Sequence, residues 1–201
     1  MYKETVIKKF NLSEKEVFLI DSFLKNLSNT NKTTNLVGKS TIKEAWGRHI
    51  CDSLQLIRFL DNKKDNIVDM GAGAGIPGII MSIMGFKSIT MIESTKKKAL
   101  FISNILSKLE ISGKIINQRI ENTKINPAKF IICRALAPLD KLFNYSLFFS
   151  NKNTTLLFLK GRSVKKEIMD AKKNYYFDYE LYPSASSKDG SVIQIKNFIK
   201  R

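Results

Sequence analysis

The sequence feature that most constrains the fold is a glycine-rich stretch, NIVDMGAGAGIPG, at residues 66–78. A short apolar run is followed by Gly71, Gly73 and Gly75, and then by Pro77. Glycine adopts positive φ and has no side chain, so a ligand can lie directly on the backbone. Pro77 suits the first turn of a helix, where free N–H groups favour an electron-rich ligand group. The stretch therefore predicts a strand, a tight loop and a helix, with a small molecule bound at the end of the strand.

Strand-like and helix-like patterns alternate through residues 64–201. Buried strands are predicted at 66–70, 88–92, 114–118, 129–133 and 154–159. Helices are predicted between or after them at 94–109, 139–149 and 164–173. The last two strands, 175–182 and 191–195, are separated only by a loop, which indicates an antiparallel hairpin. This order predicts an α/β core with a doubly wound, mostly parallel seven-stranded sheet that ends in the hairpin.

Residues 1–63 are predicted to form an N-terminal helical cap on that core, the two making one compact unit. Ser13 and Glu16 have the spacing of a capping box at the start of a helix. The polar stretch 28–34 predicts a loop, and a second helix is predicted over residues 40–57.

The net charge is the strongest property of the chain as a whole. Its 201 residues include 34 Lys+Arg against 18 Asp+Glu, a formal charge of +16. This excess favours a polyanionic partner, with nucleic acid the first candidate. The alternative is compositional drift toward A/T-rich codons, because lysine outnumbers arginine heavily and phosphate recognition often favours arginine.

The sequence indicates neither export nor a membrane. No apolar run approaches the roughly 20 residues of a membrane span, and the N-terminus lacks the apolar region of a signal peptide. Cys51 and Cys133 form no metal pattern, so reduced thiols in the cytoplasm are expected. His49 is the only histidine, and no metal site is expected.

Two glycine registers overlap in the loop. Gly73, Gly75 and Gly78 give the dinucleotide fingerprint G-x-G-x-x-G, whereas Gly71, Gly73 and Gly75 give G-x-G-x-G directly after the strand. The second register is favoured because Asp69, just before the glycines, suits a ligand ammonium better than a pyrophosphate.

Glu93 ends the second predicted strand. A carboxylate at that place can accept hydrogen bonds from both hydroxyls of a ribose; the alternative is a solvated acid in a turn. Together with the glycine loop, Glu93 favours an adenosine-type ligand.

The stretch DMGAGAGIPGI, followed by Glu93, resembles class I S-adenosylmethionine-dependent methyltransferases. Further motifs narrow the resemblance: Asn35-Leu36, GRHICDS at 47–53, ESTKKK at 93–98, Cys133-Arg134-Ala135 and Leu159-Lys160-Gly161. In this order they resemble the bacterial small-subunit ribosomal RNA guanine-N7 methyltransferase family, also called glucose-inhibited division protein B. The resemblance implies a Rossmann-like fold, S-adenosylmethionine as cofactor, and 16S ribosomal RNA or the small ribosomal subunit as partner of a protein expected to be monomeric.

The resemblance also implies roles for individual residues. The cofactor is expected to contact residues of the loops and strand ends: Asp69, Gly71, Gly73, Gly75, Ile76, Glu93, Ile120, Glu121 and Arg134. Within this set, Ile120 and Glu121 should flank the adenine. Glu93 stands where many members of the family carry Asp.

Three catalytic candidates follow from the same motifs: His49, Asp52 and Arg134. His49 is a candidate catalyst, but orienting Asp52 or supporting the cap are equally open roles. Guanine N7 carries an in-plane lone pair and loses no proton, so the protein mainly has to align the reacting atoms. Cys133 is interpreted as a buried small residue, not a nucleophile.

Basic residues near the carboxyl ends of the strands are candidates for RNA contact: Arg48, Lys96, Lys97, Lys98, Lys160, Arg162 and Lys165. Lys96–Lys98 would lie in the first turn of a helix, where positive charge opposes the macrodipole. Phosphate contact would explain that placement, and a solvated lysine run is the alternative.

We therefore predict an S-adenosylmethionine-dependent enzyme that methylates guanine N7 in 16S ribosomal RNA. One alternative is an NAD-dependent oxidoreductase that uses the other glycine register. The second is a non-catalytic RNA-binding module that retains a vestigial cofactor site.

Overall fold

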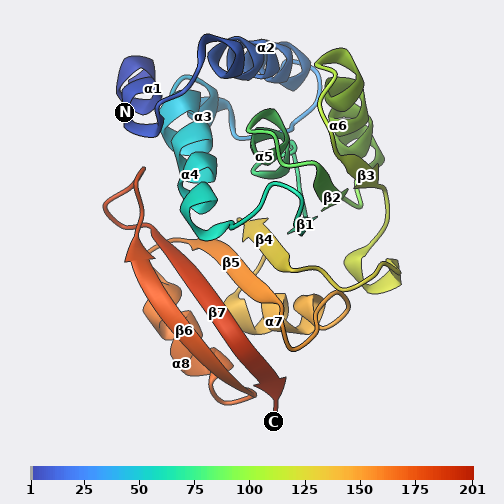
Figure 1. The fold of residues 1–201 in the computed structure, drawn as a ribbon, viewed down its shortest axis with the longest axis vertical. Coiled ribbons are helices and arrows are strands. Elements are labelled where there is room, and N and C mark those ends of the chain that lie inside the picture. Colours follow the sequence, from blue (N-terminus) through green and yellow to red (C-terminus); the bar gives the residue numbers. More distant parts are fainter. Residues whose placement is uncertain (1) are drawn as a thin grey trace.

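The computed structural model describes residues 2–201, apart from the side chain of Lys39. Its centre is a seven-stranded sheet of order β3-β2-β1-β4-β5-β7-β6 (Figure 1). The strands are β1 Asn66–Met70, β2 Ser88–Ile92, β3 Lys114–Ile116, β4 Phe130–Arg134, β5 Thr155–Lys160, β6 Tyr175–Pro183 and β7 Ser191–Lys200. The first five pair in parallel, while β7 pairs antiparallel with both β5 and β6. The predicted sheet and hairpin are confirmed.

Strand order reverses at β1, which has β2 on one side and β4 on the other. From β1 the chain winds outward first through β2 and β3, and then through β4 and β5. A crevice opens at the carboxyl ends of the strands at such a switch point, and ligands of open α/β sheets bind there.

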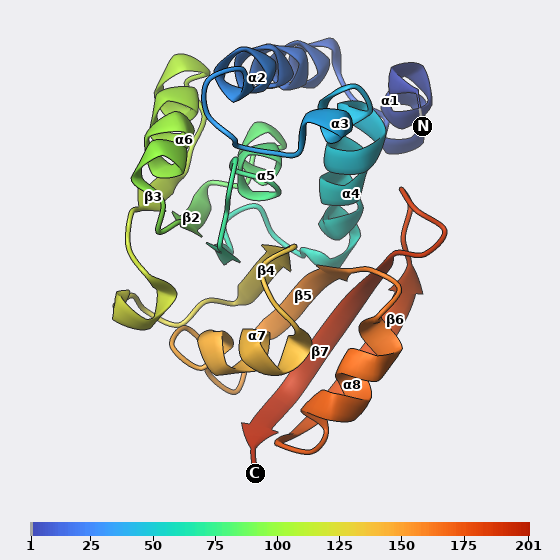
Figure 2. The same cartoon turned by 180° about the vertical axis from the view of Figure 1, so that it is seen from behind.

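Helices cover both faces of the sheet (Figures 1 and 2). The core helices are α5 Gly78–Ile83, α6 Lys96–Lys108, η3 Ile120–Asn122, α7 Leu139–Ser146 and α8 Val164–Ala171. The cap comprises α1 Lys3–Phe10, α2 Glu14–Asn31, α3 Lys39–Ile42, η1 Trp46–Ile50, α4 Cys51–Leu54 and η2 Gln55–Phe59. Helices α2 and α4 pack on α5, and α2 also contacts α6, so the cap shares one face of the sheet with these two helices.

Each face of the sheet has its own apolar core, because successive side chains of a strand point to opposite faces. On β1, Ile67 belongs to the core beneath α5, α6 and the cap. Val68 and Met70 belong to the core beneath α7 and α8. Buried cap residues such as Phe23 and Leu54 join the first of these cores, so the cap has no separate core of its own.

The cap differs from its predicted outline in two places. The capping box is confirmed, since the Ser13 hydroxyl accepts from the Glu16 N–H and Glu16 accepts from the Ser13 N–H. The predicted loop at 28–34 is wrong in its first half, because α2 continues to Asn31. The predicted helix over 40–57 is instead a succession of short α, π and 3₁₀ turns.

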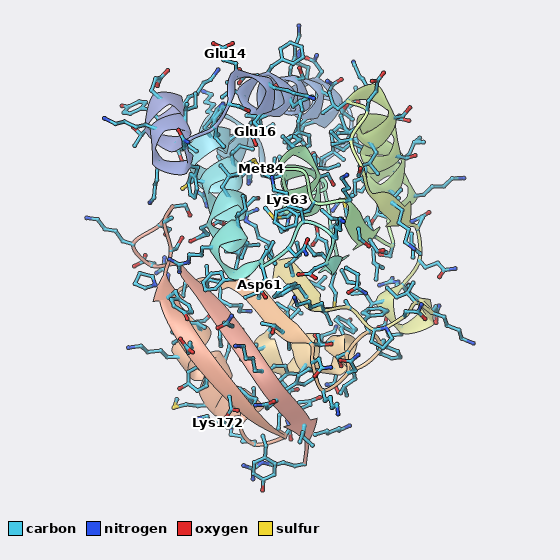
Figure 3. All side chains as sticks on the ribbon, in the orientation of Figure 1. Glu14, Glu16, Asp61, Lys63, Met84 and Lys172 are labelled. Atoms are coloured by element: carbon cyan, nitrogen blue, oxygen red, sulfur yellow. The ribbon has the colours of Figure 1, made fainter. Side chains whose placement is uncertain are left out.

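Charged side chains project around the whole outline of the molecule (Figure 3). Exposed lysines away from the crevice, such as Lys63 and Lys172, are among them, so only part of the positive charge lies at the crevice. No helix within residues 2–201 is long and apolar enough to cross a membrane.

Candidate active site

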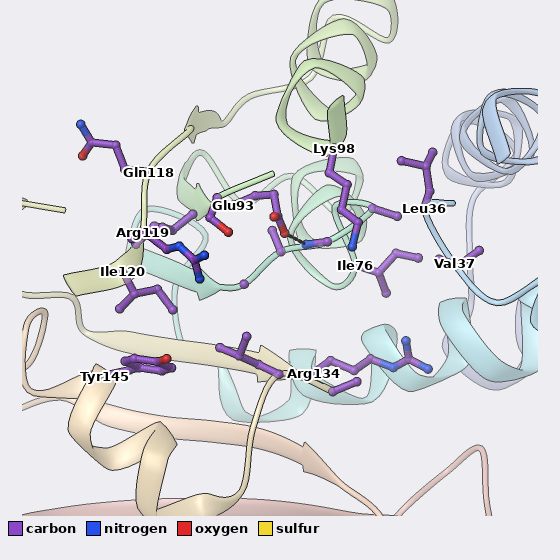
Figure 4. Close-up of a pocket in the computed structure, with 18 of the residues that line it drawn as sticks. Leu36, Val37, Ile76, Glu93, Lys98, Gln118, Arg119, Ile120, Arg134 and Tyr145 are labelled. Carbon is purple, nitrogen blue, oxygen red and sulfur yellow. Dashed lines mark hydrogen bonds between the residues drawn. The ribbon is translucent and has the colours of Figure 1, made fainter. Parts of the chain in front are cut away.

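A pocket of about 470 Å³ opens at the carboxyl ends of β1, β2 and β4 (Figure 4). Nine predicted site residues line it: His49, Gly71, Gly73, Ile76, Glu93, Lys98, Ile120, Glu121 and Arg134. The structure thus gathers residues that are distant in sequence into one cavity. Its volume is typical of a site for a small molecule.

The glycine loop forms one wall of the pocket through its backbone. Gly71 has φ +67°, and a Cβ there would lie 2.7 Å from Leu136 Cδ1. Gly73 has φ +59° and donates its N–H to Glu93 Oε2 over 2.9 Å. Glycine is needed at Gly71 and Gly73 because a side chain would be strained, and at Gly71 it would also collide with the wall.

Gly75 was predicted to contact the cofactor, but it does not line the pocket. Its φ is +83°, and a Cβ there would lie 2.4 Å from Ile79 Cγ1. Gly78 likewise allows close packing, with a Cβ position 2.6 Å from Met91 Cγ. Gly78 therefore lets the start of α5 lie close to the sheet, whereas Gly75 lets the loop pack against side chains of α5 and α6.

Asp69 also lies outside the pocket, contrary to its predicted contact with a ligand ammonium. Its side chain is fully buried, and Oδ2 accepts from the Gly78 N–H at 2.9 Å. Burial raises the pKa of this carboxyl to about 7. The next N–H groups of α5 bond to Gly75 and Pro77 carbonyls, so the start of this helix offers no free N–H for a ligand. Asp69 is a support for the glycine loop.

Glu93 lies within the pocket at the end of β2, as predicted. Its side chain is largely buried, and Oε1 accepts from the Thr95 N–H at 2.7 Å while Oε2 accepts from Gly73. Figure 4 shows the bond that ties it to the glycine loop. Each carboxylate oxygen has a second lone pair, so the same fixed group can also accept from two ligand hydroxyls.

The end of the pocket farthest from the cap segment at Leu36 and Val37 includes residues that the motifs did not single out (Figure 4). Gln118 and Arg119 follow β3, and Tyr145 projects from α7 (Figure 4). The first two could have been found from their place after a parallel strand, at the edge where ligands bind. Tyr145 gave no such signal, because it occupies an ordinary position within a helix.

The cap contributes a lid-like segment, residues 36–38, to the pocket wall. Asn31 holds it, since its buried side chain accepts from the Leu36 and Val37 N–H groups and donates to the Val37 carbonyl. These hydrogen bonds explain why a polar residue, Asn31, is buried at the end of α2.

His49 is buried, and its Nε2 lies 3.0 Å from Thr41 Oγ1. The Thr41 hydroxyl donates to the Gly38 carbonyl, so Nε2 carries the proton and Nδ1 is an unpartnered acceptor. Burial, and next the charge of Arg134, lower the pKa of His49 to about 4. The alternative role of orienting Asp52 has no support in the hydrogen bonds, because the described partners of that carboxylate do not include His49.

A neutral His49 has a consequence for stability. Its pKa in the folded chain lies below the usual value, so its contribution is present above about pH 6.5 and is lost as the pH falls toward 4. Asp69 acts in the opposite sense, because its raised pKa favours the folded state at low pH. We expect the free energy of unfolding of the native chain, minus that of His49→Gln, to fall by about 2 kcal/mol between pH 7 and pH 5. Urea denaturation at each pH measures it, and a constant difference would contradict a neutral buried imidazole.

Arg134, at the end of β4, is fixed by the cap. Its Nε donates to Asp52 Oδ2 at 2.8 Å, and its Nη2 donates to the Arg48 carbonyl at 3.0 Å. Asp52 Oδ1 accepts from Gln55 and from Ser186. Neither Gln55 nor Ser186 was predicted as a site residue, and that loop is distinguished in the sequence only by Ser184, Ser186 and Ser187.

The predicted basic residues divide into three groups. Lys98 lines the pocket just described, while Arg48, Lys160 and Arg162 line a second one beside it. Lys96, Lys97 and Lys165 line neither pocket and are exposed. Lys160 is poorly suited to RNA contact, because its ammonium pairs with Glu167 and donates to the Ala137 carbonyl.

Cys133 is buried as predicted, and its thiol donates to the Met70 carbonyl. Burial raises the pKa of the thiol further above its usual value, so it is not a nucleophile at neutral pH. Within residues 2–201, no group of three His, Cys, Asp or Glu side chains is arranged to hold a metal ion.

The fold is shared with solved methyltransferases. A glycopeptide N-methyltransferase, MtfA, complexed with S-adenosyl-L-methionine, matches with a TM-score of 0.61 at 6% identity, over 74% of this chain and 93% of that one. A ribosomal protein L11 methylase from Lactobacillus delbrueckii subsp. bulgaricus matches with a TM-score of 0.59 at 15% identity, over 72% and 75%.

The sequence comparison is more specific. The model of the GidB family, rRNA small subunit methyltransferase G, matches residues 17–192. A ribosomal RNA small subunit methyltransferase G from Rickettsia prowazekii (strain Madrid E) is 38% identical over 90% of this chain and 94% of its own length. The relative from Rickettsia rickettsii (strain Sheila Smith) matches equally well. The chain belongs to the rRNA small subunit methyltransferase G family. This family membership does not favour the alternative function of an NAD-dependent oxidoreductase.

Proposed function

We propose that this protein transfers a methyl group from S-adenosylmethionine to the N7 of a guanine in 16S ribosomal RNA. The observation that carries the proposal is a pocket, in a chain of this family, where Glu93 faces the backbone of the glycine loop. We further propose that it acts in the cytoplasm as a monomer on 16S ribosomal RNA or the small ribosomal subunit.

The residues present fit the cofactor. Gly71 and Gly73 form one side of the pocket with bare backbone, where a Cβ would strain the chain and at Gly71 would collide with Leu136. The Glu93 carboxylate can accept hydrogen bonds from the hydroxyls of a ribose. Ile120 is an apolar surface for the adenine. S-adenosylmethionine, when bound, supplies a methyl group on a sulfonium, which is a good leaving group.

The chain itself has a modest chemical task. No base is required, since N7 reacts through its lone pair, and His49 at neutral pH carries no charge with which to oppose the sulfonium. Arg134 is held rigid at the edge of the pocket by Asp52 and the Arg48 carbonyl. The protein therefore acts by placing the two reactants in line, which is where much of an enzymatic rate enhancement originates.

Transfer of labelled methyl groups tests the proposal. The purified chain is incubated with labelled S-adenosylmethionine and small subunits from cells that lack the modification. We expect label in 16S ribosomal RNA at guanine N7, detected by reductive strand cleavage at the alkylated base. Binding of NAD without binding of S-adenosylmethionine, or label at another atom, would refute it; cofactor binding without transfer would support the non-catalytic alternative.

Lys97→Glu tests whether the first turn of α6 contacts RNA. Lys97 is exposed, follows the Glu93 strand end, and lies beside the pocket residue Lys98. We expect the KM for the subunit to rise by about 3- to 10-fold and the salt dependence of binding to weaken. Cofactor affinity should not change, and the helix gains from an acid in its first turn.

Lys87→Glu is the matched control for Lys97→Glu. Lys87 is exposed and directly precedes β2, so it lies at the amino ends of the parallel strands, away from the pocket at their carboxyl ends. Equal effects of the two charge reversals would mean that only net charge matters, and the assignment of Lys97 would fail.

A further inference from the structure

A second pocket, of about 530 Å³, lies beside the first. The two share Arg134 and Ala135, which form the wall between them. Ala135 has φ +55°, a conformation that is uncommon for residues other than glycine. Such backbone is typically found at functional sites, where the surrounding structure maintains it.

The walls of the second pocket are built from distant parts of the chain. Gln55 is buried, donates to the Asp52 carboxylate at 2.8 Å, and accepts from the Ala185 N–H at 2.8 Å. Ser186 donates to the same carboxylate at 2.7 Å. The β6–β7 loop is thereby fastened to the cap, and these hydrogen bonds fix one wall of the pocket.

Four basic and four acidic side chains line this pocket: Arg48, Arg134, Lys160, Arg162, Glu44, Asp52, Glu167 and Asp189. Of the acids, Glu44 and Asp189 form no ion pair among the described side chains. Lys160 pairs with Glu167, and Arg134 pairs with Asp52. Arg48 and Arg162 also line the pocket, and among the described side chains neither forms an ion pair. An unpaired guanidinium suits a phosphate, to which it can donate two parallel hydrogen bonds.

We propose that the second pocket receives one nucleotide of the RNA substrate, drawn out of the RNA, with Arg48 and Arg162 on its phosphate groups. The proposal rests on the proposed function, because it gives the reacting guanosine a place next to the cofactor pocket. Enzymes that modify a base must take it from its stack, and the Arg134–Ala135 wall is where a base in one pocket meets a ligand in the other. Arg48 and Arg162 lie on the cap and after β5, so they would hold the backbone from two sides.

The test uses 5′-guanosine monophosphate, guanosine and inorganic phosphate as probes, titrated by NMR into the chain saturated with S-adenosylhomocysteine. We expect the monophosphate to bind without displacing S-adenosylhomocysteine. Arg162→Ala should weaken that binding about tenfold, the loss of one charged hydrogen-bond pair. Arg162→Lys should restore part of it, and guanosine affinity should change little. Lys87→Ala is the matched control, because Lys87 is exposed at the amino ends of the parallel strands, away from both pockets.

Several results would overturn the assignment. Displacement of S-adenosylhomocysteine would place the nucleotide in the first pocket. Inorganic phosphate that binds as tightly as the monophosphate would reduce the second pocket to an anion site, and an unchanged affinity in Arg162→Ala would remove the arginine from it.

A kinetic measurement separates this proposal from the proposed function. We expect Arg162→Ala to raise the KM for small subunits about tenfold while the KM for S-adenosylmethionine stays the same. If the unmodified chain transfers no methyl group, the proposed function fails. If it does so and Arg48→Ala and Arg162→Ala leave the subunit KM unchanged, only the second pocket is misassigned.

Discussion

Glu93→Ala is expected to weaken the binding of S-adenosylmethionine by about 2–3 kcal/mol, or roughly 30- to 150-fold. The variant lacks the carboxylate, so the ribose hydroxyls lose the two hydrogen bonds that Glu93 would accept. It also accepts from the Gly73 and Thr95 N–H groups, so its removal frees the glycine loop at the point where it forms the pocket wall. Calorimetric titration with S-adenosylhomocysteine measures the loss, since no turnover complicates it.

Conservative variants distinguish contact with the ligand from support of the loop. Glu93→Asp keeps both oxygens, and the resemblance implies that many relatives carry it, so we expect affinity to be largely kept. Glu93→Gln keeps one acceptor oxygen and should fall between. Glu14→Ala removes an acid at the far end of α2 and should leave affinity unchanged (Figure 3). A loss below twofold in Glu93→Ala, with the melting temperature unchanged, would exclude the ribose role.

The strands were predictable because their apolar runs are bounded by glycine, proline and polar turns. Asn66–Met70 and Ser88–Ile92 are observed at the predicted residues. The parallel order followed from the alternation of strands and helices, since right-handed crossovers permit few arrangements. Glu93 was predictable for the same reason: it ends a strand next to β1, at the switch point of the sheet.

Asp69 shows where the interpretation of the sequence failed although the signal was present. Side chains alternate along a strand, so Asp69 shares the face of Ile67, which points into the core beneath α5. Its position before the glycines suggested a ligand contact, whereas the alternation places it under the loop, where it accepts from Gly78.

Other features of the site had no local signal. Asp52 and Arg134 lie 82 residues apart, and no spacing rule pairs them. The resemblance implied that both matter but not that they bond to each other. The short turns of the cap were hidden as well, because the apolar residues of α3, η1, α4 and η2 keep a nearly helical spacing while the backbone changes its hydrogen-bond pattern.

Asp52→Ala is the second change with a large expected effect. Asp52 is the only described acidic partner of Arg134, and it also holds Gln55 and Ser186. Its side chain is 16% exposed and that of Arg134 is 21% exposed, so solvent screens the pair in part. A misplacement of about 1 Å in a positioning group can cost roughly 100-fold in rate, so we expect the loss of this pair to lower kcat/KM for methyl transfer by about 2–3 kcal/mol.

A double-mutant cycle with Arg134→Ala gives this prediction its specificity. If Asp52 acts by positioning Arg134, the double variant should be no slower than Arg134→Ala alone, because neither residue has a task without the other. Asp52→Asn, which keeps the one acceptor oxygen shared by Gln55 and Ser186 but loses the charge, should be intermediate. Affinity for S-adenosylhomocysteine and the free energy of unfolding are measured alongside. Additive losses in the cycle would mean that Asp52 serves the β6–β7 loop and not Arg134, and activity equal to that of the native chain would remove the pair from the mechanism.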